Sequence, residues 1–408
     1  MKRLFIILFF MFFLACKQEY KPENKIQEDV TFLSDDKLKG RETGTEGEKV
    51  AAEYIAERFK SLEISPKGTN AYFQEFTFKP KTDPHQEVKY NTTNSDSTIT
   101  GTNVLGFINN NADNTVIIGA HYDHLGFGSE GSLYREEDKA IHNGADDNAS
   151  GVAVMLNLAS KLKKTNTSNN YLFMAFSGEE MGLLGSNYFV KNATINLDSI
   201  NYMLNMDMVG RLKKDSTLAV YGVGTTPIFK QVINASNSKF KLIEKESGVG
   251  PSDHTSFYLN DIPVLHFFTG QHEDYHKPSD DSNLLNYEGM EAISAFIFDI
   301  ITDLNDNGKL EFRKTKNESE DAPRFKVTLG VVPDYMFDGK GMRIDGVTDD
   351  KPAHKAGIQK GDIVIQLGEL EINDMMGYMT ALSKFEKGNT TTAKIVRNGE
   401  TIEVEVTF

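Results

Sequence analysis

Three short apolar segments of this chain each lead into histidine or carboxylate side chains. The segments and the residues after them are 116–120 before His121, 171–176 before Glu179 and Glu180, and 202–206 before Asp207. Continuous apolar runs of this length are typical of strands that are buried on both faces of a parallel sheet. Ligands of open α/β sheets bind beyond the carboxyl ends of such strands. The sequence therefore predicts an α/β domain with a polar cluster at one edge of its sheet.

The rest of this region alternates between strand-like and helical patterns. We expect helices over residues 51–62, 150–162, 229–237 and 287–304, and strands over 103–108, 116–120, 171–176, 202–206, 218–221 and 264–268. Strands that alternate with helices favour a mixed, largely parallel sheet flanked by helices.

Composition narrows the classes of protein and of metal site. The formal net charge of −15 disfavours a nucleic-acid partner, because nucleic-acid binders carry a basic surface. A single cysteine among 408 residues excludes an intrachain disulfide and a cysteine-rich zinc module. Any metal in this protein must therefore be bound by histidine and carboxylate side chains.

The N-terminus has the pattern of an export signal. Met1-Lys2-Arg3 is basic, and the apolar residues 4–15 that follow are too few for a comfortable transmembrane helix. The sequence F-L-A-C that ends at Cys16 resembles a bacterial lipobox, which implies a signal peptide over 1–16 and a lipid on Cys16. We expect an exported protein that a lipid anchors in the bacterial cell envelope, at the periplasmic face or outer membrane, through a tether over 17–28. A plain signal peptide with an incidental cysteine is the alternative.

The polar cluster has the composition of a site for two metal ions. Oxygen and imidazole ligands suit zinc in a catalytic site, and also manganese or cobalt. Two neighbouring dications need a shared ligand, which a carboxylate can provide. Each ion would then have one histidine and one carboxylate of its own, and the two ions would share one further carboxylate. The residues with this composition are His121, Asp147, Glu180, Asp207 and His276.

Two further carboxylates have a predicted role beside the metal ligands. Glu179 and Glu180 leave their turn in different directions, so Glu179 can stay free as a base while Glu180 binds metal. Asp123 is suited to hold the second ring nitrogen of His121. For His124 we expect a structural hydrogen bond rather than a metal.

Five motifs in this order resemble the co-catalytic zinc aminopeptidase family: H-Y-D-H-L-G, G-A-D-D-N-A-S-G, S-G-E-E-M-G-L-L-G-S, N-M-D-M-V-G and Y-H-K-P-S-D-D. That family includes glutamate carboxypeptidases, glutaminyl cyclases and the non-catalytic transferrin receptor ectodomain. The resemblance covers residues 29–304. It implies that Asp147 bridges two Zn²⁺ ions, that His121 and Asp207 serve separate ions, and that Glu180 and His276 complete the ligands. It also implies Glu179 as the general base and Tyr275 as a donor to the oxyanion, while Asp280 is a candidate to orient His276.

The resemblance implies a zinc-dependent metallopeptidase, with an aminopeptidase as the first expectation. Two metal ions would activate a bridging water, and Glu179 would accept its proton. A carboxypeptidase, a dipeptidase or a glutaminyl cyclase is the alternative on the same fold. A catalytically silent peptide-binding adaptor is a further alternative, which the intact ligand set and Glu179 disfavour.

A polar segment over 305–322 predicts a linker to a second domain over 323–408. This domain resembles a PDZ domain of the bacterial protease type, on Leu329-Gly330-Val331 and on the motif K-P-A-H-K-A-G-I-Q-K-G-D-I-V. The resemblance implies that the N–H groups of Leu329, Gly330 and Val331 bind a peptide C-terminus beside a helix over 374–386. The alternative is a domain that only packs on the catalytic unit.

Overall fold

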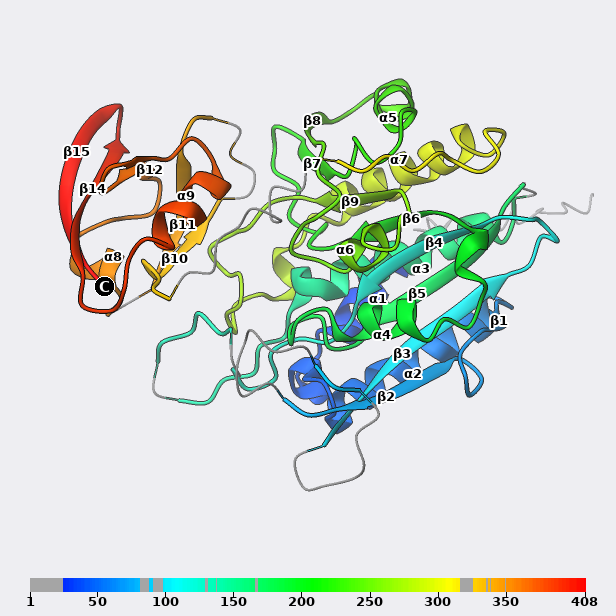
Figure 1. Ribbon diagram of the computed structural model, residues 1–408. Helices are drawn as coiled ribbons and strands as arrows, with labels where there is room; N and C mark the ends of the chain where they lie inside the picture. The colour runs from blue at the N-terminus through cyan, green and yellow to red at the C-terminus, as the bar shows by residue number, and fades with distance from the viewer. Residues whose placement is uncertain are drawn as a thin grey trace, which may run out of the picture.

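The computed structural model describes residues 25–80, 88–90, 98–128, 131–136, 138–165, 168–315, 326–334, 337, 339–348 and 350–408. The predicted signal peptide with Cys16, and residues 17–24 of the predicted tether, lie outside the described residues. Figure 1 shows a larger α/β unit and a smaller β unit at the C-terminus. In the described ranges, no helix has both the length and the apolar character that a membrane crossing requires.

A mixed sheet forms the centre of the α/β unit. Within the described residues it has nine strands in the order β1-β3-β5-β4-β6-β9-β7-β8, with β2 beside β3. Its centre is parallel: β4 (Thr115–His121) lies between β5 (Asn170–Phe176) and β6 (Ile200–Met206), and β6 pairs with β9 (Val264–Phe268). The outer strands are β1 (Ser65–Pro66), β2 (Phe73–Phe78), β3 (Ile99–Ile108), β7 (Thr217–Tyr221) and β8 (Lys241–Lys245). A mixed sheet with a parallel centre confirms the predicted fold class.

The pattern of β4 shows why this strand lies in the middle. All of its residues are buried, and successive side chains point to opposite faces of the sheet. Val116, Ile118 and Ala120 belong to one hydrophobic core, whereas Ile117 belongs to the core on the other face. A strand between two apolar layers has no polar face, which is the pattern that the sequence displays.

Helices cover both faces of the sheet (Figure 1). The first core is closed by α1 (Lys25–Leu33), α2 (Glu46–Ser61), α3 (Gly151–Leu162), α5 (Phe229–Ser236) and α7 (Tyr287–Asp303). The second core is closed by α4 (Leu184–Lys191) and α6 (His254–Tyr258). Short turns of helix at η1 (Asp36–Arg41), η3 (Leu197–Ser199) and η4 (Ser282–Leu284) join some of these elements.

Both predicted connecting segments extend less far than expected. Helix α1 begins at Lys25, and its Ile26 is buried in the main core, so the last four residues of the predicted tether are folded. In the predicted linker, Leu310 is buried and Phe312 packs on the second core, while the hydroxyl groups of Thr315 and Tyr258 lie 3.0 Å apart. These apolar side chains hold residues 310–315 against the α/β unit.

The C-terminal unit is an antiparallel sheet with two helices. Its order is β10-β11-β12-β14-β15, and β13 pairs with β12. The elements are β10 (Val331–Pro333), β11 (Met342–Val347), α8 (Pro352–Lys355), β12 (Ile363–Leu367), β13 (Leu370–Glu371), α9 (Met375–Leu382), β14 (Thr390–Arg397) and β15 (Glu400–Thr407). Its own core includes Leu329, Leu367, Ile395 and Val406. Helix α9 is shorter than the predicted helix over 374–386, and Asp374 caps it by accepting a hydrogen bond from the N–H of Gly377.

Candidate metal centre and catalytic site

Neighbouring strands bring the predicted ligands to one edge of the sheet. His121 is the last residue of β4 and lies opposite Phe176, the last residue of β5. Glu179 and Glu180 follow β5 in a tight turn, and Asp207 follows β6 on the other side of β4. The strand order β5-β4-β6 therefore places residues from separate parts of the sequence side by side.

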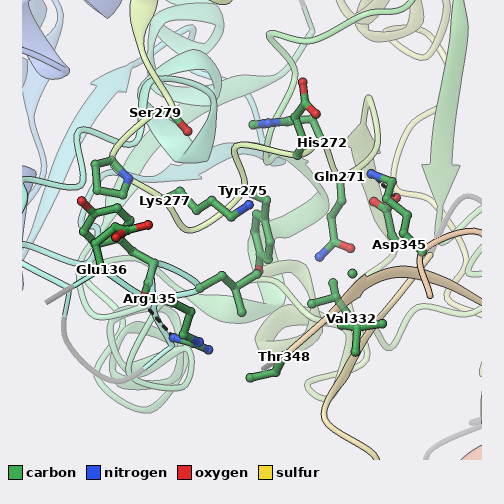
Figure 2. A pocket seen from close by; sticks show the side chains of 17 residues that line it. Arg135, Glu136, Gln271, His272, Tyr275, Lys277, Ser279, Val332, Asp345 and Thr348 are labelled. Atoms are coloured by element: carbon green, nitrogen blue, oxygen red, sulfur yellow. Dashed lines mark hydrogen bonds and ion pairs between the residues drawn. The ribbon is translucent and has the colours of Figure 1, made fainter. Parts of the chain in front are cut away.

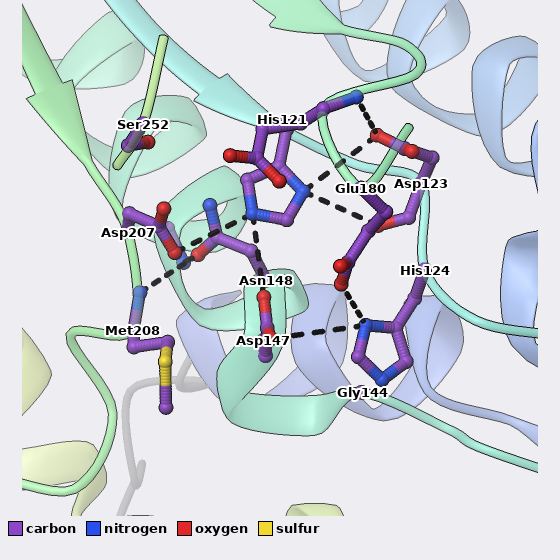
Figure 3. Close-up of polar contacts among 12 residues, drawn as sticks. His121, Asp123, His124, Gly144, Asp147, Asn148, Glu180, Asp207, Met208 and Ser252 are labelled. Carbon is purple, nitrogen blue, oxygen red and sulfur yellow. Dashed lines mark hydrogen bonds and ion pairs between the residues drawn. The ribbon is translucent and has the colours of Figure 1, made fainter. Parts of the chain in front are cut away.

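His121, Asp147 and Asp207 form a first group of candidate metal ligands (Figure 3). The Nε2 atom of His121 lies 3.3 Å from Asp147 Oδ1 and 3.4 Å from Asp207 Oδ1. The expectation that His121 and Asp207 serve separate ions is therefore wrong. Both instead belong to one group with Asp147, because β4 and β6, whose ends carry them, are direct neighbours.

The second oxygen of Asp147 belongs to another group. The Nε2 atom of His276 lies 3.2 Å from Asp147 Oδ2 and 3.3 Å from Glu180 Oε2. All five predicted ligands therefore come together, in two groups that share Asp147. A buried carboxylate with one imidazole nitrogen at each oxygen fits a bridge between two zinc ions, since carboxylate and neutral imidazole are zinc ligands.

The loop η2 (Ala145–Ser150), which carries Asp147, is fixed to the end of β6. The side chain of Asn148 donates to the carbonyl of Met206 and accepts from the N–H groups of Gly151 and Met208, with distances of 2.9–3.2 Å. Met206 and Met208 flank Asp207, so Asn148 sets the spacing between two of the ligands.

The neighbouring Asp146 has a different role. Its Oδ1 atom accepts a hydrogen bond of 2.6 Å from the N–H of Gly210, and its Oδ2 atom lies 3.2 Å from His272 Nε2. Asp146 thus fastens the chain that follows β6. Asp147 is the residue of this acidic pair that reaches the other ligands.

Asp280 does not orient His276, contrary to the expectation from the sequence. The Oδ2 atom of Asp280 accepts hydrogen bonds from the backbone N–H groups of Asp146 and Asp147, at 2.9 and 3.0 Å. His276 is held instead by the carbonyl oxygen of Gly131, which lies 2.9 Å from its Nδ1 atom. When Nδ1 carries the hydrogen, the lone pair of Nε2 is free for a metal, as a zinc ligand requires.

Asp123 lies beside two of the predicted site residues, His121 and Glu179. Its Oδ1 atom lies 3.6 Å from His121 Nδ1 and accepts a hydrogen bond of 3.1 Å from the backbone N–H of Glu179. Its Oδ2 atom accepts from the hydroxyl of Thr43 at 3.0 Å. Asp123 thus lies beside His121, but the hydrogen-bond distance of 3.3 Å from His121 Nδ1 is to the backbone carbonyl oxygen of Asp123 rather than to its carboxylate. The contact with Glu179 adds a function that residue spacing could not reveal.

Burial and the neighbouring charges shift the pKa values of several side chains in this site. Burial raises the pKa of Glu179 well above its ordinary value, and Asp207 and Glu180 raise it further. Burial alone would lower the pKa of His276, but Glu180 and Asp147 outweigh this effect and raise it to about 11. Asp147 has a pKa well below its ordinary value, because hydrogen bonds from His121 and His276 overcome the effect of burial.

His124 makes the structural hydrogen bond that was expected. Its Nδ1 atom lies 2.8 Å from Glu180 Oε1, and the ring is fully buried. The ring also stands 3.9 Å from Asp147 Oδ2, so His124, Asp147 and Glu180 also lie close enough together to hold a metal ion. We assign His124 to hold Glu180, because His276 already faces the other oxygen of that carboxylate.

Arg41 is a structural residue of the site whose role the sequence did not indicate. Its buried guanidinium donates hydrogen bonds to the carbonyl oxygens of Tyr122, Asn143, Gly144 and Leu33. It thereby joins the residue after His121 to the segment before Asp147. Gly144 has a φ of +55°, and a Cβ there would lie 2.1 Å from the carbonyl oxygen of Asp147, so the tight approach requires glycine.

Tyr275 borders the ligand cluster. Its ring stacks on that of His276 with a centroid distance of 3.8 Å, and it lines the cavity that contains the ligands. Burial raises the pKa of its hydroxyl well above the ordinary value, and the nearby carboxylates act in the same direction. The hydroxyl therefore keeps its proton and remains a hydrogen-bond donor.

The predicted peptide-binding loop leads into β10. The N–H of Gly330 donates to the hydroxyl of Thr328 at 3.0 Å, while Leu329 is buried in the core of the unit. Gly330 has a φ of +72°, and a Cβ there would meet the side chain of Lys351 at 2.2 Å. The loop therefore has the tight glycine turn that a carboxylate-binding loop needs, and a ligand would have to displace Thr328 from the N–H of Gly330.

Comparison with known proteins matches two families. Residues 103–301 match peptidase family M28, and residues 310–408 match the PDZ domain. A probable leucine aminopeptidase of Trichophyton verrucosum is 34% identical over 173 residues, which are 40% of this chain and 44% of that protein. The chain thus spans less than half the length of this curated relative.

Solved structures share the fold at low sequence identity. The aminopeptidase from Aneurinibacillus sp. strain AM-1 matches with a TM-score of 0.53 and 19% identity, over 71% of this chain and 94% of that one. The glutaminyl cyclase of Porphyromonas gingivalis matches with a TM-score of 0.53 and 17% identity, over 69% and 97%. The fold is therefore that of zinc exopeptidases and of a glutaminyl cyclase.

Proposed function

Because the chain joins a peptidase family M28 domain to a PDZ domain, we propose that it is a zinc-dependent metallopeptidase that removes N-terminal residues from peptides. The observation that carries the proposal is the position of Asp147, whose two oxygens face His121 and His276 at 3.3 and 3.2 Å. Non-catalytic binding would not require this convergence of five buried or half-buried ligand side chains.

Two Zn²⁺ ions would be held by two groups of residues. His121, Asp147 and Asp207 would hold one, and Asp147, Glu180 and His276 the other. When bound, zinc supplies Lewis-acid chemistry, since a dication lowers the pKa of water and polarises a carbonyl group.

The side chains around the ions would move and hold protons. Glu179 would take the proton of the attacking water and pass it to the leaving amine, because its carboxylate lines the cavity that contains both ligand groups. Asp123 would fix the position of Glu179 through its backbone N–H. Tyr275 would donate the hydrogen bond of its hydroxyl to the developing oxyanion.

We further propose that the chain is exported and anchored in the bacterial cell envelope by a lipid on Cys16. The F-L-A-C sequence after the apolar residues 4–15 supports this proposal. The test is membrane fractionation of cells that express the full chain or its Cys16→Ser variant. We expect the wild type with the membranes, and an unchanged distribution of the variant would contradict lipidation.

For the PDZ domain we propose a peptide partner that binds through its C-terminus. The tight turn at Gly330, next to the edge strand β10, supports this proposal. An array of peptides with free and amidated C-termini tests it, and equal binding of both forms would contradict it.

One assay tests the proposed activity. The purified protein with zinc is given peptides with free and with acetylated N-termini, and products are identified by mass spectrometry. We expect stepwise loss of N-terminal residues from the free peptides only. Cleavage of acetylated peptides would favour a carboxypeptidase, and loss of ammonia from N-terminal glutamine would favour a cyclase. No reaction at any zinc concentration would favour an adaptor.

A further inference from the structure

The PDZ domain contributes to the wall of the catalytic cavity. This cavity has a volume of about 310 Å³ and contains His121, Asp147 and Glu179. One side of it is formed by Val331, Val332 and Pro333, which together are the strand β10. A domain whose own core is separate from the α/β unit thus reaches the site of the proposed chemistry.

A second cavity of about 730 Å³ continues from the first toward the PDZ domain (Figure 2). The two share Leu133, Gln271, Tyr275 and Val332 as lining residues, so they form one cleft. Figure 2 shows Val332 and Thr348 of the PDZ domain across the space from Gln271 and Tyr275 of the peptidase domain. The cleft therefore runs from the candidate metal ligands into the boundary between the domains.

The strand on this boundary has a free edge. β10 is the end of its sheet and pairs with β11. The carbonyl of Gly330 accepts a hydrogen bond from the N–H of Thr348, the residue after β11, and the N–H of Asp334 donates to the carbonyl of Arg343 in β11. By alternation, the polar backbone groups of Val331 and Pro333 therefore face away from β11. Pro333 has no N–H, which is tolerated at an edge. The free edge offers the N–H and carbonyl of Val331 and the carbonyl of Pro333.

A polar contact joins the segment after β10 to the peptidase domain. The Nζ atom of Lys245, at the end of β8, lies 3.5 Å from the carbonyl oxygen of Phe337 in the PDZ domain. The guanidinium of Arg343 stands 4.8 Å above the ring of Phe337 and pairs with Asp334, the residue after β10. The segment that follows β10 is therefore joined to the peptidase domain through Lys245, and to its own domain through Arg343.

The charges of the cleft indicate the chemistry of its occupant. Basic and acidic side chains line the outer cavity in equal number: Arg135, Lys277 and Lys360 with Glu136, Glu273 and Asp345. Lys360 and Asp345 already pair with each other at 3.0 Å. Such a balance does not select a highly charged ligand, and it suits a peptide main chain, which is polar without net charge.

We propose that β10 is a wall of the substrate cleft, and that its free edge binds the part of the substrate that follows the scissile bond, in extended conformation. This inference rests on the proposed function. The continuity of the two cavities makes the substrate itself the occupant, since a chain whose scissile bond lies at Glu179 can extend along β10 into the outer cavity. The substrates would be short or unfolded peptides, because a folded N-terminus does not fit between two domains.

The experiment uses the absence of tryptophan from this sequence. Val332→Trp narrows the cleft and introduces a unique tryptophan in the full chain. The matched control is Thr401→Trp on β15, an exposed position at the opposite edge of the same sheet. Two substrates are compared: leucine p-nitroanilide, which ends just beyond the scissile bond, and a pentapeptide that begins with leucine.

We expect Val332→Trp to lower kcat/KM for the pentapeptide about tenfold more than for the anilide, because only the longer substrate extends along β10, and we expect Thr401→Trp to change neither value by more than about twofold. The pentapeptide should also shift the tryptophan emission of Val332→Trp, but not that of Thr401→Trp. Val332→Ala, which keeps the strand and removes packing, should lower the pentapeptide value by a smaller factor.

Three results would overturn the inference while the proposed function stands: equal loss with both substrates, no loss with either, or the same emission response in Val332→Trp and the control. If the wild type cleaves neither substrate, the proposed function fails instead. In that case the emission shift still decides whether peptides bind along β10.

Discussion

The carboxylate of Asp280 accepts a hydrogen bond of 3.0 Å from the backbone N–H of Asp147, the residue shared by the two ligand groups. Asp280 is fully buried and also accepts from the N–H of Asp146. Two hydrogen bonds that converge on one carboxylate oxygen fix the backbone of the residue that the two ligand groups share. Partners behind a ligand commonly tune metal affinity in this way.

Asp280→Ala should therefore weaken metal binding without removing a ligand. We expect the affinity for zinc to fall by about 10–100-fold, as is typical when such a partner is lost. Competition with a chromophoric chelator measures it. Asp281→Ala is the control, because the Oδ1 atom of Asp281 accepts a hydrogen bond of 3.4 Å from the side chain of Asn143 rather than from the N–H of Asp147. Equal affinities of the two variants would contradict this role for Asp280.

Glu179→Gln should separate metal binding from catalysis. The side chain keeps its shape but can no longer accept a proton, so we expect a loss of about 10²-fold or more in kcat, with zinc content unchanged. Elemental analysis and peptide hydrolysis measure the two quantities. Asp147→Ala should instead lose bound zinc, and its activity should fall because the metal is gone. Full turnover by Glu179→Gln would exclude Glu179 as the base.

The raised pKa of His276 predicts that zinc binding releases protons. In the metal-free protein Glu180 and Asp147 overcome the effect of burial and raise this pKa to about 11, so His276 is protonated at neutral pH. Zinc must displace that proton, and its apparent affinity should rise about tenfold per pH unit for each proton displaced. Calorimetry at pH 7 in buffers of different protonation enthalpy should report at least one released proton. Release of none would contradict the prediction.

The same shift has a defined sign for the stability of the metal-free protein. A histidine whose pKa is raised by folding stabilises the folded state fully below its unfolded pKa of about 6.5. The contribution of His276 should be lost as the pH rises from there toward 11. Urea unfolding with a chelator present, measured at several pH values, would detect this loss, and zinc should reverse it.

The sequence predicted the central strands because burial on both faces leaves a continuous apolar signal, as at 116–120. It also predicted which residue types meet at the strand ends, since parallel strands place their carboxyl ends together. It did not predict β8 (Lys241–Lys245), which lies at the edge of the sheet and has only two apolar residues, Leu242 and Ile243, between charged ones. The helix α4 was also missed, because glycines at 182 and 185 conceal its start.

Contacts between distant segments could not be predicted. Asp280 is 133 residues from Asp147, and Gly131 is 145 residues from His276, so neither pairing leaves a local pattern. The division of the ligands into two groups depends on β4 and β6 being neighbours, which the chain order alone does not specify. The position of β10 depends on contacts such as that between Lys245 and Phe337, on two different domains.

Arg41→Lys tests whether one buried side chain holds the site together. Arg41 is 1% exposed and donates to four backbone carbonyls, among them those of Tyr122 and Gly144 at 2.7 and 3.0 Å. Lysine has a single ammonium group and cannot reach all four, so buried carbonyls lose their donors. We expect a loss of about 2–4 kcal/mol in the free energy of unfolding.

Arg135→Lys, at an exposed arginine, should change the free energy of unfolding by less than about 0.5 kcal/mol. Urea unfolding of both variants, with zinc and with a chelator, measures the difference. A cost for Arg41→Lys no larger than that of the control would show that the four carbonyls do not depend on this guanidinium.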